Sequence, residues 1–233
     1  MTNDLIQIKV KQRLNKLDSS DYDNIQCWQI SEAYNKVKTE WVRRQIEGLN
    51  QKQQGDEASK NKIDDIQILL VEKPMLAFEK DLYFESNALP EDYGYFKRVT
   101  ANCVVECCPD RKLSVNLQKE ADINELLDDE HKKPSVEWGE TFATLFGNKI
   151  RVYTNGEFKI SDLKLIYYRQ PVRIEFKGCI NENTGEEVLE DVECEFKDDI
   201  IEILIDMTAS VLSGDTELFN QYQRNQSNAQ INT

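Results

Sequence analysis

The chain changes its hydrophobic periodicity twice, and this change constrains the fold more than any other feature of the sequence. Apolar residues follow a helical spacing in the first third, alternate as in β-strands through the middle, and return to a helical spacing near the end. Helices and strands segregated along a chain in this way are typical of α+β proteins. The sequence therefore predicts an α+β protein whose N- and C-terminal helices form a helical bundle with an inserted antiparallel β domain.

The first part of the chain has the pattern of two helices. Ile6, Val10, Leu14 and Leu17 recur at the spacing of one helical stripe. A second, longer helix is expected to end near Gly48, because glycine readily adopts the conformation that stops a helix.

The middle part has the pattern of strands. Its segments are short, rich in valine, isoleucine and aromatic residues, and separated by turn dipeptides such as Asn155-Gly156. They are "LAFEKDLYFE", "FKRVTANCVVECC", "KLSVNLQ", "NKIRVYT", "EFKI", "LKLIYYRQPVRIEF" and "VECEF". We therefore divide the chain into an N-terminal helical part (1–73), a mainly antiparallel β part (74–197), and a C-terminal helix with an extended arm (198–233) that packs on the N-terminal helices or on neighbouring copies.

Composition and charge exclude several classes of protein. Hydrophobic residues make up 39% of the 233 residues and charged residues 31%, as in a folded, water-soluble domain. The net charge of −14 argues against binding to nucleic acid phosphates. The apolar stretches are shorter than the roughly 20 residues that cross a bilayer, and the N-terminus does not resemble a signal peptide. We expect no membrane association.

The six cysteines lack the regular spacing of a secreted disulfide framework. In an intracellular protein they are expected to be reduced. The cluster "CVVECC" has no CxxC pair or nearby histidine to complete a zinc site. We therefore expect buried thiols and no metal.

The sequence offers few groups for catalysis. His131 is the single histidine and lies in a densely charged stretch, and neither a GxSxG nor a GxxxxGK[ST] motif is present. Adjacent acids such as Asp128 and Asp129 leave a small acid-pair hydrolase as the last-ranked class of function. We expect no catalytic residue and no cofactor.

Two features suggest contact with other protein chains. Tyr167, Tyr168 and Arg169 combine residue types that are enriched in interfaces, although the tyrosines could equally pack within the sheet. After Gly214 the chain becomes polar and amide-rich, and Leu218, Phe219 and Tyr222 interrupt that run. These three residues could form the apolar face of an arm that docks on a partner, or belong to a frayed terminus.

Four stretches in a fixed order carry a resemblance to a known family. They are "DYDNIQCWQISEAYNKVKTEWVRRQIEG" with "SKNKIDDIQILL", "YFESNALPEDYGYFKRVTANC", "LKLIYYRQPVRIEFKG" and "VECEFKDDIIEILIDMTASVLSGDTELFNQYQRNQ". Together they cover most of the chain, and none is a catalytic signature. The sequence resembles the head-to-tail adaptor, or ring, proteins of tailed bacteriophages, and looks closest to ring proteins of crAss-like phages.

The resemblance implies a structural virion protein rather than an enzyme. Such proteins form a ring of about twelve copies beneath the portal protein, with other tail or ring proteins below. DNA passes through the channel during ejection without specific binding, and an acidic wall suits that passage. The protein would be made in the host cytoplasm and reside at the head–tail interface of the virion. The competing class is a cytosolic protein-binding module or regulator, which would stay a monomer or dimer even with portal present.

Overall fold

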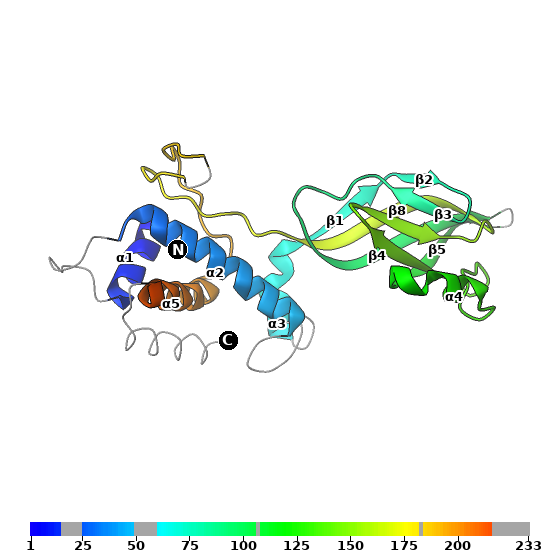
Figure 1. Ribbon diagram of the computed structural model, residues 1–233, viewed down its shortest axis with the longest axis horizontal. Coiled ribbons are helices and arrows are strands. Elements are labelled where there is room, and N and C mark those ends of the chain that lie inside the picture. The colour runs from blue at the N-terminus through cyan, green and yellow to red at the C-terminus, as the bar shows by residue number, and fades with distance from the viewer. Residues whose placement is uncertain (15–24, 49–59, 106–107, 182–183, 216–233) are drawn as a thin grey trace. The chain divides into compact units, whose positions relative to one another are not determined.

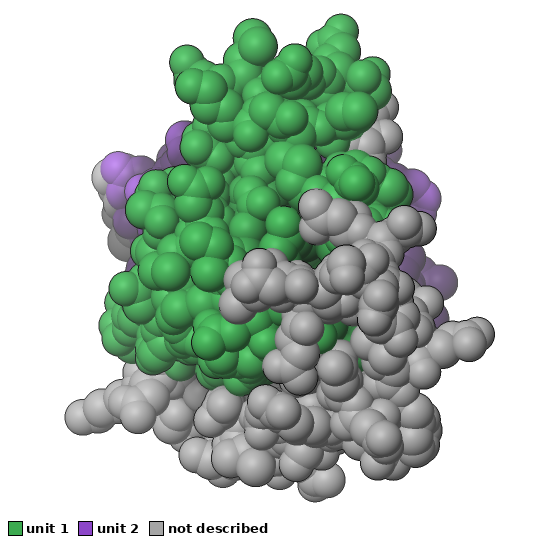
Figure 2. All heavy atoms as spheres, turned by 90° about the vertical axis from the view of Figure 1, so that its left-hand side faces the viewer, with its two compact units in different colours: residues 1–68, 171–233 green, residues 69–170 purple. Residues whose placement is uncertain are grey.

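The computed structural model describes residues 1–14, 25–48, 60–105, 108–181 and 184–215. The chain divides into two compact units, which Figure 2 shows in green and purple. Unit 1 comprises residues 1–68 and 171–233, and unit 2 comprises residues 69–170. The helices are α1 (Asn3–Arg13), α2 (Cys27–Glu47), α3 (Lys60–Ile66) and α5 (Asp198–Asp215) in unit 1, and α4 (Ile123–Asp128) in unit 2.

Helices α1 and α2 of unit 1 both pack against α5 (Figure 1). Ile6, Val10 and Leu14 are completely buried, so the stripe expected for the first helix faces the core over its described residues. Helix α2 is followed by Gly48 in the left-handed conformation at φ 73°, which confirms the predicted stop.

Helix α5 is the most apolar helix of unit 1 and begins at Asp198, where the sequence places its start. Ile201, Leu204 and Ile205 are completely buried. On the α1 side, Arg13 Nε donates to Asp206 Oδ1 at 2.8 Å. The two helices are therefore joined by both apolar packing and ion pairing.

The remainder of unit 1 is the segment 171–197, which connects β8 to α5. Its described residues form isolated bridges, Glu175 with Val192 and Ile180 with Glu187, instead of regular strands. The strand expected at "VECEF" is therefore absent from the described structure. Side-chain contacts with α1 and α2 must hold this segment in place, because a sheet ladder does not.

Unit 2 is built on one eight-stranded sheet in the order β1-β8-β4-β5-β6-β7-β3-β2. The strands are β1 (Leu70–Met75), β2 (Ala77–Glu79), β3 (Tyr83–Ser86), β4 (Tyr93–Val105), β5 (Cys108–Leu117), β6 (Glu140–Phe146), β7 (Lys149–Tyr153) and β8 (Lys159–Arg169). The sheet is curled nearly closed, so that the edge strand β2 also contacts β8. Its core includes Ala143, Ile150, Val152, Leu163 and Leu165.

One strand pair in this sheet is parallel. Strands β5 and β6 run in the same direction, whereas all the other paired strands are antiparallel. A parallel pair needs a crossover connection, and residues 118–139 with α4 supply it. Ile123 of α4 packs with Phe142 and Tyr153 and so fixes this connection on the sheet.

The predicted fold class is wrong. The described structure is a mixed α/β protein dominated by the nearly closed sheet with five short helices, rather than a helical bundle carrying an antiparallel insertion. Alternation along a strand reveals which residues face inward, but not which strand lies alongside it or in which direction. The compact units divide at 68/69 and 170/171, whereas the boundaries predicted from the sequence lie at 73/74 and 197/198.

Candidate interaction sites

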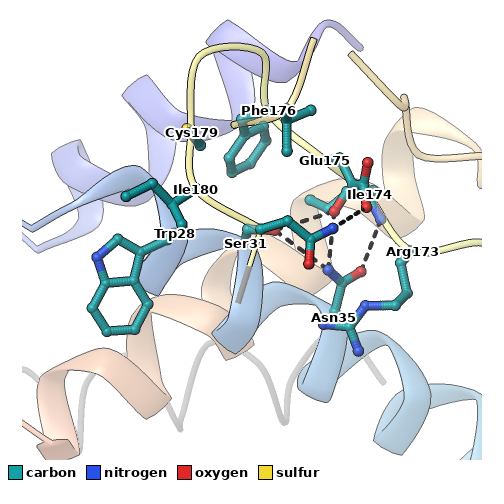
Figure 3. Close-up of a pocket in the computed structure, with 11 residues that line it drawn as sticks. Trp28, Ser31, Asn35, Arg173, Ile174, Glu175, Phe176, Cys179 and Ile180 are labelled. Carbon is teal, nitrogen blue, oxygen red and sulfur yellow. Dashed lines mark hydrogen bonds between the residues drawn. The ribbon is translucent and has the colours of Figure 1, made fainter. Parts of the chain in front are cut away.

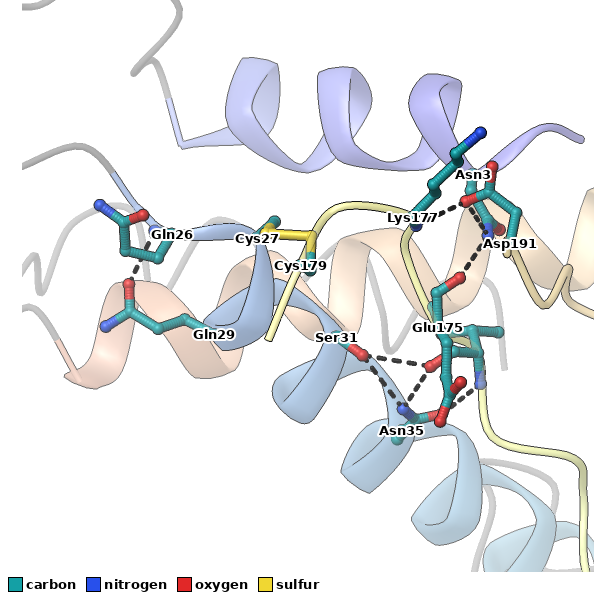
Figure 4. The surroundings of a disulfide bond; sticks show 11 residues. Asn3, Gln26, Cys27, Gln29, Ser31, Asn35, Glu175, Lys177, Cys179 and Asp191 are labelled. Carbon is teal, nitrogen blue, oxygen red and sulfur yellow. Dashed lines mark hydrogen bonds between the residues drawn. A yellow bond between two sulfur atoms is a disulfide. The ribbon is translucent and has the colours of Figure 1, made fainter. Parts of the chain in front are cut away.

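The segment 171–197 is attached to α2 by a disulfide. Cys27 at the start of α2 and Cys179 are 152 residues apart in the sequence and bonded, with their Cα atoms 5.9 Å apart (Figure 4). The expectation of reduced thiols is therefore wrong for this pair. Sequence spacing could not reveal the bond, because the two cysteines meet only after folding. Cys103 and Cys194 are free thiols in the described residues.

A second attachment is made by Asn35 in the middle of α2. Its side-chain amide donates to the carbonyl of Ile174 at 3.0 Å and accepts from the backbone N–H of Ile174 at 2.9 Å (Figure 3). The hydroxyl of Ser31, one turn earlier, donates to the same carbonyl at 3.1 Å. Asn35 thus pairs with the segment as a neighbouring strand would, which explains why this polar side chain is buried.

Asn3 at the start of α1 makes the third attachment. Its amide lies 2.9 Å from the carbonyl of Glu175 and 3.1 Å from Asp191 Oδ1 (Figure 4). Asp191 also accepts from the backbone N–H of Lys177 at 3.0 Å. These hydrogen bonds, from Lys177 first and then from Asn3, lower the pKa of Asp191. An ionised carboxylate therefore ties the two halves of the segment together.

The pocket beside these attachments is too small for a ligand. Figure 3 shows Trp28 and Ile180 at one end of it, and Asn35 and Arg173 at the other. Its volume of about 20 Å³ holds roughly one water molecule. We therefore assign the pocket a structural role.

Both units expose large apolar side chains. Leu189 in segment 171–197 is 79% exposed, and Ile180 is also exposed. In unit 2, Leu76, which precedes the edge strand β2, is 66% exposed, and Phe78 within that strand is 52% exposed. A single exposed leucine is ordinary in a folded protein, but these side chains supply apolar surface on two different units.

The predicted interface residues of the sheet are mostly buried. Tyr167 and Tyr168 lie in β8 and are both buried, while Arg169 is half-buried. Tyr167 Oη donates to Asp92 Oδ1 at 2.8 Å, and burial, followed by this hydrogen bond, raises the pKa of Tyr167 to about 12. The two tyrosines thus have the packing role that the sequence left open as an alternative. Leu218, Phe219 and Tyr222 lie outside the described residues.

Asp128 is the last residue of α4, and Asp129 follows it at the end of the helix. Asp129 Oδ1 accepts from the backbone N–H of His131 at 2.9 Å, and its other oxygen lies 3.2 Å from Lys132 Nζ. These contacts, the His131 bond first, lower the pKa of Asp129. A general acid needs a raised pKa, so Asp129 is better described as a residue that stabilises a turn. His131 itself is exposed.

Another acidic pair in unit 1, Asp64 and Asp65, lies against one lysine. Lys197 is ion-paired with Asp64 and lies 3.7 Å from Asp65. Burial is the main cause that raises the pKa of Asp65; Lys197 opposes it, and Asp199 adds to the rise. This arrangement is a surface ion-pair network, and such networks also shift pKa values without catalysis.

No protein-family model matches this chain, and no curated protein matches it significantly. The described residues contain no group of three or more histidine, cysteine, aspartate or glutamate side chains placed to hold a metal ion. Among the helices of the described part, none is both long and apolar enough to cross a membrane.

Proposed function

We propose that the protein is a structural connector of a tailed bacteriophage virion. Copies of the chain form a ring, about twelve in number, that docks below the portal protein and lines the path of DNA exit. The assignment rests on the sequence resemblance. The observation in its support is that both units expose large apolar side chains, at Phe78 and Leu76 in unit 2 and at Leu189 and Ile180 in unit 1.

Exposed apolar residues on two units are what a ring subunit requires. In a ring, one surface of each copy meets a different surface of the next, so a subunit needs two unlike contact sites. We assign Leu189 to one of these sites and Phe78 to the other. The net charge of −14 also supports the proposal, because an acidic channel does not bind the phosphates of moving DNA.

Assembly with portal is the direct test. The full chain is mixed with the portal protein of the same virus and examined by sedimentation velocity and negative-stain electron microscopy. We expect rings stacked on portal. A chain that stays a monomer or dimer in the presence of portal contradicts the proposal and favours a cytosolic binding module.

Two variants test the paired contact sites. Leu189→Glu and Phe78→Glu each place a charge in one proposed site, so either change alone should prevent ring closure. When the two variants are mixed, each pair of unlike chains still has one intact contact, and heterodimers should form. Thr184→Glu and Lys80→Glu add charge at exposed polar positions of the same regions and should assemble normally. Assembly by both single variants would show that these residues are not the contact sites.

The alternative function, a protein-binding module, uses the same exposed residues but needs no second copy. It predicts that the single variants lose a partner other than the chain itself while their oligomeric state is unchanged. The sedimentation profile of the unmodified chain with portal separates the two functions.

A further inference from the structure

A cavity of about 180 Å³ opens on unit 2 and is independent of the exposed residues at β2. It lies where β5 and β6 meet the connection between them. Its lining combines apolar, amide, carboxylate and indole groups. The residues that matter for its chemistry are Asn116, Gln118, Leu126, Trp138, Glu140 and Phe142.

The strand register places polar and apolar side chains side by side in this cavity. Ser114 pairs with Glu140 and Asn116 pairs with Phe142 in the parallel ladder. Residues two apart in a strand project from the same face, so Asn116, Glu140 and Phe142 share one face of the sheet. Phe142 belongs to the apolar cluster against which Leu126 of α4 packs, and it supplies an apolar floor. The floor is therefore bordered directly by hydrogen-bonding groups.

Trp138 stands at the rim and is 80% exposed. The turn that carries it is closed by two backbone hydrogen bonds between Ser135 and Glu140, at 3.0 and 3.1 Å. Gly139 supplies the left-handed conformation of this turn at φ 68°, and Arg111 donates to the carbonyl of Glu137 at 2.9 Å. The indole is therefore held on a fixed turn, which reduces the entropy lost when a ligand binds.

The charges around the cavity do not favour an anion. Lys132 lies 3.2 Å from Asp129, and Lys133 lies 3.8 Å from Glu157. With Glu140 in the lining, these two ammonium groups are matched by three carboxylates. A phosphate or carboxylate ligand would find no excess of positive charge here.

The polar groups of the lining suit hydroxyl groups. Among the described residues, the side-chain amides of Asn116 and Gln118 are exposed and make no hydrogen bond within the protein. An amide supplies both donors and an acceptor, and the Glu140 carboxylate supplies acceptors. A ligand with adjacent hydroxyls and an apolar face would satisfy both the amides and the indole.

We propose that this cavity binds one neutral sugar ring at the end of a glycan. The apolar face of the pyranose lies against the Trp138 indole, and its hydroxyls bond to Asn116, Gln118 and Glu140. The cavity is smaller than the roughly 300–1,000 Å³ of pockets for drug-sized ligands, which limits it to a single ring. This binding activity is separate from the connector function and does not depend on ring assembly.

Ligand-observed saturation-transfer NMR on the full chain tests the proposal. The probes are the methyl glycosides of glucose, galactose, mannose and N-acetylglucosamine. We expect at least one to bind with a dissociation constant on the order of 1 mM, which is typical for a ligand of this size. Trp138→Ala should weaken that binding at least about tenfold. Trp138 is exposed, so its replacement leaves the folded core intact.

The controls separate the cavity from other surfaces. Trp28→Ala removes an exposed tryptophan of unit 1 and should leave the dissociation constant unchanged, whereas Asn116→Ala should raise it several-fold. The proposal is overturned if none of the four glycosides binds, if binding survives Trp138→Ala, or if inorganic phosphate binds more tightly than every glycoside. Each of these results leaves the assembly test with portal unaffected.

Discussion

The two units of the molecule are stabilised by different kinds of interaction. Unit 2 is a sheet in which seven strand pairs are joined by backbone ladders. In unit 1, the described residues of segment 171–197 form no such ladder, and the segment is fixed by Asn3, Asn35 and the Cys27–Cys179 disulfide. A ladder uses atoms that almost every residue possesses, whereas the attachments in unit 1 need particular side chains.

This difference predicts where substitutions act. In unit 2 a substitution lowers stability mainly by changing the side-chain volume in the core, because the backbone hydrogen bonds remain in place. In unit 1 a conservative change of one anchoring side chain removes a specific bond and leaves a buried backbone group without its partner. The exposed apolar residues of segment 171–197 therefore depend on a few anchors for their position.

The largest expected effect is a cavity in the core of unit 2. Leu165 is completely buried in β8, between β1 and β4, and Leu165→Ala should destabilise the unit by about 2–5 kcal/mol. Amide hydrogen exchange measured by mass spectrometry should become faster in β4 and β8 of this variant than in the unmodified chain. The increase in α2 should be smaller. Leu117→Ala, at an exposed position of β5, should change exchange very little. Equal loss of protection in α2 would show that the two units unfold together.

Removal of the disulfide should have the next largest effect, and it should act on unit 1. Replacing Cys27 and Cys179 with serine should cost about 2–4 kcal/mol, because the bond restricts a long loop of the unfolded chain. Urea unfolding followed by the fluorescence of Trp41, which is buried in α2, measures the loss.

Reduction provides the matching control. Dithiothreitol should destabilise the unmodified chain by a similar amount and leave the double serine variant unchanged. An unmodified chain whose unfolding midpoint is insensitive to reduction would contradict a stabilising role for the Cys27–Cys179 bond.

The helices could be predicted from the sequence because their signals are local. The stripe at Ile6 and Val10, the stop at Gly48 and the start of α5 at Asp198 each depend on residues within a few turns. Strands were recognisable for the same reason, since β7 falls within the predicted segment "NKIRVYT" and β4 and β8 overlap predicted segments. Local periodicity fixes the type of an element but not its neighbours.

The pairing of strands was not predictable, and Asn155-Gly156 shows why. Both residues adopt positive φ, as the dipeptide suggests, and form a turn. The strands on either side, β7 and β8, nevertheless pair with other strands rather than with each other. A turn reverses the chain locally, but the neighbour of each strand is decided by long-range packing.

The same limit applies to the candidate sites. Tyr167 and Tyr168 are adjacent in a strand and project to opposite faces, yet both are buried, because the chain covers both faces of β8 at this point. No local sequence pattern predicts either the cavity beside Trp138 or the disulfide. Each is formed by residues that are distant in sequence, although an isolated tryptophan next to a glycine could have drawn attention to the turn at Trp138.

A buried lysine sharpens the contrast between the units and gives the smallest of the predicted effects. Lys38 of α2 is 1% exposed, and its ammonium donates to the carbonyl of Val172. Burial lowers the pKa of Lys38 from 10.5 to about 8, with Arg173 acting in the same direction and with Cys194 and Glu195 opposing it. Unit 1 therefore contains an amine that loses its proton more easily in the folded chain than in the unfolded chain.

The sign of the resulting pH dependence follows from that pKa. Between pH 8 and 10.5 the unfolded chain binds more protons at Lys38 than the folded chain does, so this residue makes stability rise with pH. Lys38 should raise the free energy of unfolding by about 2 kcal/mol from pH 8 to pH 9.5, and this gain is lost as the pH falls back towards 8. Urea unfolding at the two pH values, compared between the unmodified chain and Lys38→Met, separates the contribution of Lys38 from those of other titrating groups.

The control is Lys36→Met, at an exposed position of the same helix, which should keep the pH dependence of the unmodified chain. If Lys38→Met also keeps the pH dependence of the unmodified chain, the ammonium of Lys38 is hydrated in solution. Segment 171–197 would then be held less closely against α2 than its contacts with Asn35 require.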